Sequence, residues 1–395
     1  MKPIYLDYNA TTPIDPRVAE AIQPFLADGL AGIFGNPSSS HLYGQRAHQA
    51  VDESRVQLAR LLDCAPEEIV FTGSGSEADN LAIKGVAEAY RERGHQFITS
   101  QIEHPAVVIS CRYLERHGCR VPYLPVDASG RVNPTDVERA LTPETILVSI
   151  MHANNETGTL QPIREIAALV RPRGILLHTD AAQSVGKIPT QVDDLGVDLL
   201  TVAGHKLYAP KGIGALYVRS GVRLESLIHG AGHEGGRRAG TENVPYQTAL
   251  GEAAELARTT LADEGNRLRE LRDRLQDFLA QRVPGLVLNG HPTERLPNTL
   301  NVSFPDVDGE ELLAATPLVA ASTGSACHAG RTDPSEVLLA MGLTRERALG
   351  AVRLSLGRFT TATDVDRAAD ALATAWRAMA GRSGSDEVSS SERAT

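Results

Sequence analysis

The sequence predicts an α/β fold with a mostly parallel sheet, followed by a smaller α+β domain. From about residue 45, short apolar runs alternate with segments whose apolar residues recur at helical spacing, which is typical of a parallel sheet flanked by helices. After about residue 245 the pattern changes to a long charged helical segment, two short strand candidates and a final helix. With 395 residues, 42% of them hydrophobic, the chain is long enough for both domains.

Seven strand candidates, each a short run rich in apolar residues, make up the α/β part. They read EEIVFT, HQFITS, RVPYLPV, TILVSIM, GILLHTD, VDLLTVAG and IGALYVR. Helical patterns such as QAVDESRVQLARLL and PIREIAALVR stand between strand candidates or before them. In the later part, EGNRLRELRDRLQDFLAQRV and TDVDRAADALATAWRAMA predict helices, and TLNVSFP and AVRLSLG predict strands.

Charge and composition exclude several classes of function. The net charge is −10 without long basic runs, so we expect neither nucleic acid nor an anionic membrane as a partner. We find no membrane-spanning apolar run and no signal peptide, and we expect a cytoplasmic protein. Cys64, Cys111, Cys119 and Cys327 form no C-x-x-C pair, so we expect reduced thiols. His233 begins HEGGR, which lacks the second histidine of a zinc motif, and we expect no bound metal.

Ligands of open parallel sheets bind beyond the carboxyl ends of the strands. In FTGSGSEADNLAIKG a Gly/Ser loop leads from a strand into a helix, and Gly75 and Ser76 would bind a phosphate through free backbone N–H groups. Residues 73–78 also match the dinucleotide pattern G-x-G-x-x-A, so a nicotinamide-dependent oxidoreductase is an alternative. That pattern requires an acidic residue after the next strand, where the sequence has both Glu103 and His104.

Three further strand ends carry polar residues. Asp180 follows GILLHT, with Gln183 three positions on, and Lys206 follows VDLLTVAGH. A reactive lysine, an acidic partner for a pyridinium nitrogen and a phosphate-binding loop are together what a pyridoxal phosphate enzyme requires. Taken singly, Asp180 could cap a helix and Lys206 could be a solvated loop lysine, as we expect for Lys211. Asn155, in the loop HANNETG, could bind the cofactor or substrate, or could simply favour a turn.

These residues stand in motifs that resemble the cysteine desulfurases of the NifS/IscS type, a group of fold-type I pyridoxal phosphate enzymes. The resemblance covers roughly residues 3–375 and rests on ten blocks in family order. They are YLDYNATTP, GNPSSS, FTGSGSEADNLAIKG, EHPAV, HANNETG, HTDAAQ, GHKLYAPKGIGALYVR, RRAGTENV, STGSACHAG and VRLSLGRFTT. The family fold implies a large domain with a mostly parallel seven-stranded sheet and a smaller α+β domain.

The resemblance implies a role for each residue around the cofactor, pyridoxal 5′-phosphate. Lys206 corresponds to the lysine that forms the Schiff base, and Asp180 to the residue on the pyridine nitrogen. Gln183 corresponds to the residue on the phenolic oxygen. His104 would stack on the ring and act in catalysis, and Asn155 would lie beside the ring and the substrate.

The phosphate and the substrate carboxylate have implied partners too. Gly75, Ser76 and His205 would bind the phosphate together with Thr241, which the neighbouring subunit would supply in a homodimer with composite sites. Arg353 resembles the arginine that binds the substrate carboxylate, a role that suits its fork of N–H donors.

Sulfur transfer is expected at Cys327. Its thiolate would attack the sulfur of L-cysteine, which leaves L-alanine and an enzyme persulfide for an acceptor protein. The acceptor stays open among an iron–sulfur scaffold, tRNA thiolation, a cofactor pathway and a sulfur-containing metabolite. Ala203, where many relatives have a phosphate-binding serine, and the SACH segment with His328 are reminiscent of selenocysteine lyases, so L-selenocysteine is an alternative substrate. A sulfur-relay module without turnover is a further alternative.

We expect a large cofactor-binding domain over residues 15–258. Residues 1–14 and 259–380 would form the small domain that carries the catalytic cysteine. The tail, 381–395, holds one apolar residue among serine, glycine and charged residues, and we expect it to be disordered.

Overall fold

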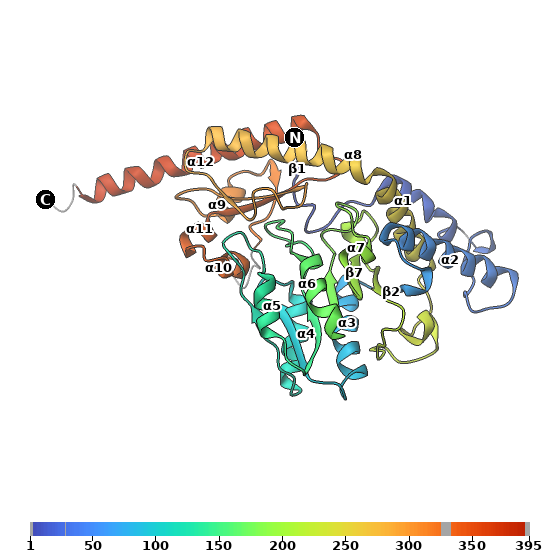
Figure 1. Cartoon of the computed structure of the whole chain (residues 1–395). Helices are drawn as coiled ribbons and strands as arrows, with labels where there is room; N and C mark the ends of the chain where they lie inside the picture. Colours follow the sequence, from blue (N-terminus) through green and yellow to red (C-terminus); the bar gives the residue numbers. More distant parts are fainter. Residues whose placement is uncertain (1–2, 28, 325–332, 392–395) are drawn as a thin grey trace.

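A computed structural model describes residues 3–27, 29–324 and 333–391, and its centre is a seven-stranded sheet (Figure 1). The strand order is β2-β8-β7-β6-β5-β3-β4. All strands run parallel except β8, which is antiparallel to both of its neighbours. The strands are β2 (Ile69–Thr72), β3 (Gln96–Ser100), β4 (Tyr123–Leu124), β5 (Thr145–Ser149), β6 (Leu176–Asp180), β7 (Leu199–Ala203) and β8 (Gly214–Val218). The seven predicted strands and the mostly parallel sheet are confirmed.

Helices connect these strands, and several of them begin at a residue whose side chain caps the helix. Ser74 caps α3 by accepting a hydrogen bond from the Glu77 N–H. Asn133 caps α5 in the same way, and Pro134 is the first residue of that helix. The helices of this part are α1 (Pro16–Ala21), α2 (Leu42–Leu62), α3 (Gly75–Ala89), α4 (Pro105–Arg116), α5 (Pro134–Ala140), α6 (Ile163–Val170) and α7 (Val192–Leu195).

The rest of the chain forms two small sheets covered by helices. An antiparallel sheet has the order β12-β10-β9, and β1 pairs in parallel with β11. The strands are β1 (Ile4–Tyr5), β9 (Val287–Asn289), β10 (Thr299–Ser303), β11 (Val319–Ala320) and β12 (Ala351–Ser355). The helices are α8 (Val244–Arg282), α9 (Gly309–Ala314), α10 (Glu336–Ala340), α11 (Arg345–Leu349) and α12 (Ala362–Ser391).

Helix α8 joins the two parts of the molecule and begins earlier than the charged pattern predicts. Its first half buries small residues such as Ala253 and Ala257 in the core beside the large sheet. Its second half buries Leu275 and Leu279 in a separate core with the small sheets, and Figure 1 shows α8 reaching from the region of α1 and α2 to that of α12. The boundary predicted at residue 258 lies inside this helix, and the division into domains stays a prediction.

Two further findings concern the ends and the surface. Helix α12 continues to Ser391, into the tail for which we predicted disorder, while residues 392–395 lie outside the described residues. The tail has no proline to end a helix, and extending an existing helix is far easier than starting one. Among the described residues, no helix is long and apolar enough to cross a membrane.

Candidate functional site

A cavity of about 340 Å³ lies where the carboxyl ends of the central strands meet the small sheet. Because this is the edge at which parallel sheets bind ligands, the predicted site residues should converge here. Eight of them line the cavity: Gly75, Ser76, His104, Asn155, Asp180, His205, Lys206 and Arg353. The lining also contains Asn9, Ala10, Ser74, Asp79, Ala182 and Ala203.

The phosphate-binding end of the cavity is the start of α3. Gly75 packs so closely on β7 that a Cβ there would lie 3.0 Å from the Cβ of Ala203. The absence of a side chain leaves backbone N–H groups at the start of a 15-residue helix accessible, as an anion requires. Burial and the charge of Lys206 lower the pKa of His205 to about 4, so its ring is neutral, and its Nδ1 lies 3.2 Å from Thr11 Oγ1.

Lys206 stands directly after β7, at the end of the short 3-10 helix Gly204–Lys206. Burial lowers the pKa of its amine, and Arg353 lowers it further, against the opposing effect of Asp180. A lysine in such surroundings loses its proton more readily than one in water. Asp180 ends β6 and accepts a hydrogen bond from the Ala182 N–H at 2.9 Å, in a turn rather than at the start of a helix.

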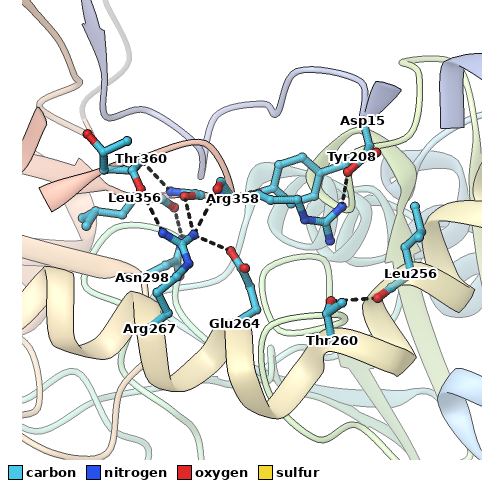
Figure 2. A network of polar contacts seen from close by, with 12 residues as sticks. Asp15, Tyr208, Leu256, Thr260, Glu264, Arg267, Asn298, Leu356, Arg358 and Thr360 are labelled. Carbon is cyan, nitrogen blue, oxygen red and sulfur yellow. Dashed lines mark hydrogen bonds and ion pairs between the residues drawn. The ribbon is translucent and has the colours of Figure 1, made fainter. Parts of the chain in front are cut away.

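The turn after Lys206 is held by contacts to the small sheet region, and part of this network is drawn in Figure 2. Tyr208 has φ +66°, which is unfavourable for a bulky side chain. Its N–H donates to Thr12 Oγ1 at 2.9 Å, and its hydroxyl accepts from the Arg358 N–H at 2.7 Å. The Arg358 guanidinium in turn donates to Asp15. These contacts fix the backbone that follows Lys206.

Asp79, in the first turns of α3, is a lining residue that the sequence did not suggest. It is 1% exposed, and its Oδ1 lies 3.7 Å from His178 Nε2. Within the described part of the chain this atom has no hydrogen-bond partner. Burial and the charge of Asp180 raise the pKa of Asp79 well above its usual value. Its position one helical turn after Gly75 is the sequence signal that could have identified Asp79 as a residue of the site.

His104 begins α4, and its hydrogen bonds decide which ring nitrogen carries the proton. Its Nδ1 accepts from the Ala106 N–H at 3.2 Å, which leaves the proton on Nε2 in the neutral ring. Burial lowers the pKa of His104. Its neighbour Glu103 does not line this cavity and accepts instead from Ser100 and the Met151 N–H. Glu103 therefore cannot serve as the ribose-binding acid of the dinucleotide pattern.

Arg353, on β12, reaches the cavity from the small sheet. Its Nη2 donates to Asp7 Oδ1 at 2.8 Å and its Nη1 donates to the Asn155 carbonyl at 3.1 Å. Its buried Nε has no partner among the residues that the structure describes. The guanidinium is thus held by fixed groups, with donor capacity left for a carboxylate.

Gln183 does not line the cavity, but its amide is oriented by two contacts. Its Nε2 donates to the Asn9 carbonyl at 3.0 Å, and its Oε1 accepts from Lys187 Nζ at 3.1 Å. Desolvation, together with Lys206 and Arg353, lowers the pKa of Lys187 to about 7. The amide nitrogen of Gln183 has a second N–H, for which no acceptor is found among the residues that the structure describes.

Two further predicted residues are not placed in this cavity by the structure. Thr241 is exposed and does not line the cavity of its own chain, and Cys327 lies outside the described residues, as does His328. Desolvation raises the pKa of the thiols of Cys64 and Cys111 to about 12, and burial also raises that of Cys119. These three thiols are therefore poor nucleophiles.

The cavity residues fit pyridoxal phosphate. A lysine of lowered pKa and a buried carboxylate lie in one cavity with a helix start whose glycine leaves room for an anion. Asp79, His104 and Asp180 also place one potential metal ligand each within 4.8 Å of one another. Those atoms line the same cavity, so they form no separate site.

Comparison with known proteins gives consistent results. The family model described as aminotransferase class-V matches residues 4–368. A cysteine desulfurase IscS of Pectobacterium carotovorum (strain PC1) is 50% identical over 367 residues, 92% of this chain and 90% of that protein. The IscS of Dictyoglomus turgidum is 46% identical over 93% of each chain.

Solved structures agree with these sequence matches. A NifS-like protein superposes with a TM-score of 0.88 at 36% identity, covering 94% of this chain and 98% of that one. A structure titled "SspA in complex with cysteine" gives a TM-score of 0.79 at 38% identity, covering 90% and 99%.

Proposed function

This chain belongs to the aminotransferase class-V family, and we propose that it is a cysteine desulfurase that converts L-cysteine to L-alanine and passes the sulfur to an acceptor. One observation carries the proposal: Asp180 at the end of β6, Lys206 shortly after β7 and Arg353 on β12 line one cavity. The curated relatives at about half identity bear the same activity in their names, and a related structure is described in complex with cysteine.

Pyridoxal 5′-phosphate is the proposed cofactor. Lys206 would bind it covalently, Asp180 would face its ring nitrogen, and the start of α3 at Gly75 would bind its phosphate. Gln183 would donate to its phenolic oxygen through the free amide N–H. When bound, the cofactor supplies a protonated pyridine ring that withdraws electrons from the substrate carbons.

The chain's own groups position the substrate and move its protons. Asp7 and Asn155 hold the Arg353 guanidinium in place, and Arg353 binds the carboxylate with its remaining N–H donors. The lowered pKa of Lys206 suits a base that removes the α-proton and returns a proton. His104 presents an N–H at Nε2, so it would stabilise the substrate sulfur by donating a hydrogen bond rather than by removing its proton.

Cys327 is the proposed nucleophile. Its thiolate attacks the substrate sulfur, an S–S bond forms, the C–S bond breaks, and the substrate Cβ takes up a proton, which yields alanine. Substrate and thiol together hold all the atoms and electrons of alanine and the persulfide, so no external oxidant is required. An acceptor protein would then take the sulfur.

A homodimer with composite sites and a cytoplasmic location complete the proposal. The dimer is supported by exposed apolar side chains between α1 and α2 and in the loop before Thr241. These are Leu26, Leu30, Phe34, Leu42, Leu227 and Ile228. An exposed Thr241 beside such a surface could reach the cavity of a second copy.

The test compares two variants with the native protein. Lys206→Ala should lose the visible absorption of the lysine-bound cofactor, whereas Cys327→Ala should keep it and lose sulfide release from cysteine. Alanine formation by Cys327→Ala at the native rate would contradict the nucleophile assignment. Ala203 lines the cavity where the resemblance implies a serine in many relatives, and the same assay with selenocysteine decides whether a lyase activity on that substrate prevails.

A further inference from the structure

A threonine near the start of the chain spans the turn that carries Lys206. Thr12 lies between β1 and α1 and is 5% exposed. Its Oγ1 donates a hydrogen bond to the His205 carbonyl at 3.1 Å and accepts one from the Tyr208 N–H at 2.9 Å. Because these two residues stand before and after Lys206 in the chain, one hydroxyl group bridges the backbone on both sides of the lysine.

The backbone around Thr12 makes further contacts with the same turn. The Thr12 N–H donates to the His205 carbonyl at 2.9 Å, and the Asp15 N–H donates to the Tyr208 carbonyl at 3.1 Å. Thr11 Oγ1 lies 3.2 Å from Nδ1 of the His205 ring. Thr12 and His205 are 193 positions apart in the sequence, so the turn is held by a segment that only folding brings to it.

The turn itself is too short to be stable without such contacts. Lys206 ends a 3-10 helix of three residues, Gly204–Lys206, and the Leu207 N–H donates to the Gly204 carbonyl at 2.9 Å. A single turn of this kind gains one hydrogen bond for several fixed backbone angles, which does not stabilise it in isolation. The position of the Lys206 backbone therefore depends on contacts from outside the turn, among them those of Thr12.

Tyr208 shows that the end of this turn is strained. Its φ of +66° is unfavourable for a bulky side chain and persists only where the surroundings favour it. The surroundings are the Thr12 hydroxyl at its N–H, the Asp15 N–H at its carbonyl and the Arg358 N–H at its hydroxyl (Figure 2). Without Thr12 Oγ1, the Tyr208 N–H would lose its acceptor, and the strained conformation would lose one of the contacts that hold it.

Thr12 can affect the site only through the lysine turn. It does not line the cavity of about 340 Å³, whereas Lys206 does, together with Gly75 and Asp180. The reactive nitrogen of Lys206 lies at the end of a flexible four-carbon side chain, so the place of its backbone decides which positions the nitrogen can reach. Thr12 is therefore a candidate for a positioning residue and not for a catalytic one.

We propose that the Thr12 hydroxyl positions Lys206 for its bond to the cofactor by joining the backbone before and after this lysine. The inference rests on the proposed function, in which Lys206 binds pyridoxal phosphate. Thr12 acts on the reaction between the lysine and the cofactor aldehyde. Binding of the cofactor ring and phosphate remains with Gly75, Asp180 and the other cavity residues.

The first experiment compares Thr12→Val, which keeps the shape of the side chain and loses the hydroxyl, with Thr12→Ser, which keeps the hydroxyl. Pyridoxal phosphate is mixed with the cofactor-free full-length protein, and the visible absorption of the lysine-bound cofactor is followed in time. Thr12→Val should form this bond at least about tenfold more slowly than the native protein, because small misplacements of reacting groups reduce rates strongly. Thr12→Ser should recover most of the rate.

Pyridoxamine 5′-phosphate separates the positioning of Lys206 from a general loss of structure. This ligand has an amine in place of the aldehyde, so it can occupy the same cavity but cannot form the bond to the lysine. Its affinity for Thr12→Val, measured by fluorescence titration, should stay within about threefold of the native value, because a change without shared contacts has little effect on binding.

Two more variants cover folding and stability. The Thr142 hydroxyl also bridges two groups, donating to Gln96 Oε1 at 2.8 Å and accepting from the Glu144 N–H at 3.2 Å. Thr142 lies before β5, at the edge of the sheet opposite the cavity, so Thr142→Val is the matched control and should react with the cofactor as the native protein does. If Thr12→Val fails to fold, Thr12→Ala takes its place, since alanine puts no methyl group against the His205 carbonyl.

The outcomes separate this inference from the function beneath it. A folded Thr12→Val or Thr12→Ala protein that binds the cofactor covalently at the native rate would overturn the positioning role. Equal losses of rate in Thr12→Val and Thr12→Ser, or an equal loss of affinity for pyridoxamine phosphate, would overturn it as well. A native protein that forms no lysine-bound absorption with pyridoxal phosphate would instead overturn the proposed function.

Discussion

Glu103 offers a direct test of how burial controls charge beside the active site. Its carboxyl group is 6% exposed and accepts from Ser100 Oγ at 2.5 Å and from the Met151 N–H at 3.0 Å. Burial raises its pKa to about 8, in spite of these hydrogen bonds. We expect Glu103→Gln, which imitates the protonated acid, to remove a pH-dependent loss of stability.

The expected size of this loss of stability follows from the pKa values of Glu103 in the folded and the unfolded protein. In the unfolded chain the glutamate pKa is 4.5, so between that value and about 8 the folded protein binds the extra proton and its stability falls as the pH rises. At about 1.4 kcal/mol per pH unit, the native protein should lose about 3 kcal/mol between about pH 6 and about pH 9 through this group. The Glu103→Gln variant should not lose this part of its stability.

Denaturant unfolding of the cofactor-free protein at both pH values measures the difference, since bound cofactor would add its own stabilisation. Titrating groups that do not interact with Glu103 contribute equally to both proteins and cancel in the difference between their pH slopes. Glu294→Gln is the matched control, because Glu294 is exposed and its replacement should leave the slope unchanged. Identical pH slopes in the native protein and Glu103→Gln would refute the reasoning.

Three further variants test the cavity. Arg353→Lys should raise the KM for cysteine at least about tenfold with a smaller effect on kcat, since an ammonium cannot bind a carboxylate through two parallel hydrogen bonds; steady-state kinetics measure both. Gly75→Ala should weaken cofactor binding in a titration of cofactor-free protein, because the new Cβ would lie 3.0 Å from Ala203. Ala203→Ser should slow cofactor loss on dialysis by adding a hydroxyl at the phosphate end, and an unchanged rate would contradict its placement there.

The fold was largely predictable because its signals are local. Each strand of the large sheet is a short apolar run, and the glycine, the acid and the lysine of the site lie at the ends of β2, β6 and β7 or within a few residues of them. Parallel strands place their carboxyl ends along one edge, so sequence position alone brings Gly75, Asp180 and Lys206 toward one cavity. The first half of α8 escaped prediction because its buried alanines face a core that only the folded chain creates.

The sequence alone determined which chemical groups this protein has at its strand ends, and the tertiary structure decided their charges and partners. A pKa depends on burial and on charges brought from distant segments, so the raised pKa of Asp79 follows only from its burial in the folded chain and from the charge of Asp180. Arg353 meets Asp7 across 346 positions, and Glu156 meets Ser335 across 179. Contacts of this kind leave no local pattern in the sequence. The folding of the chain, and not the spacing along it, sets the distance between the two side chains.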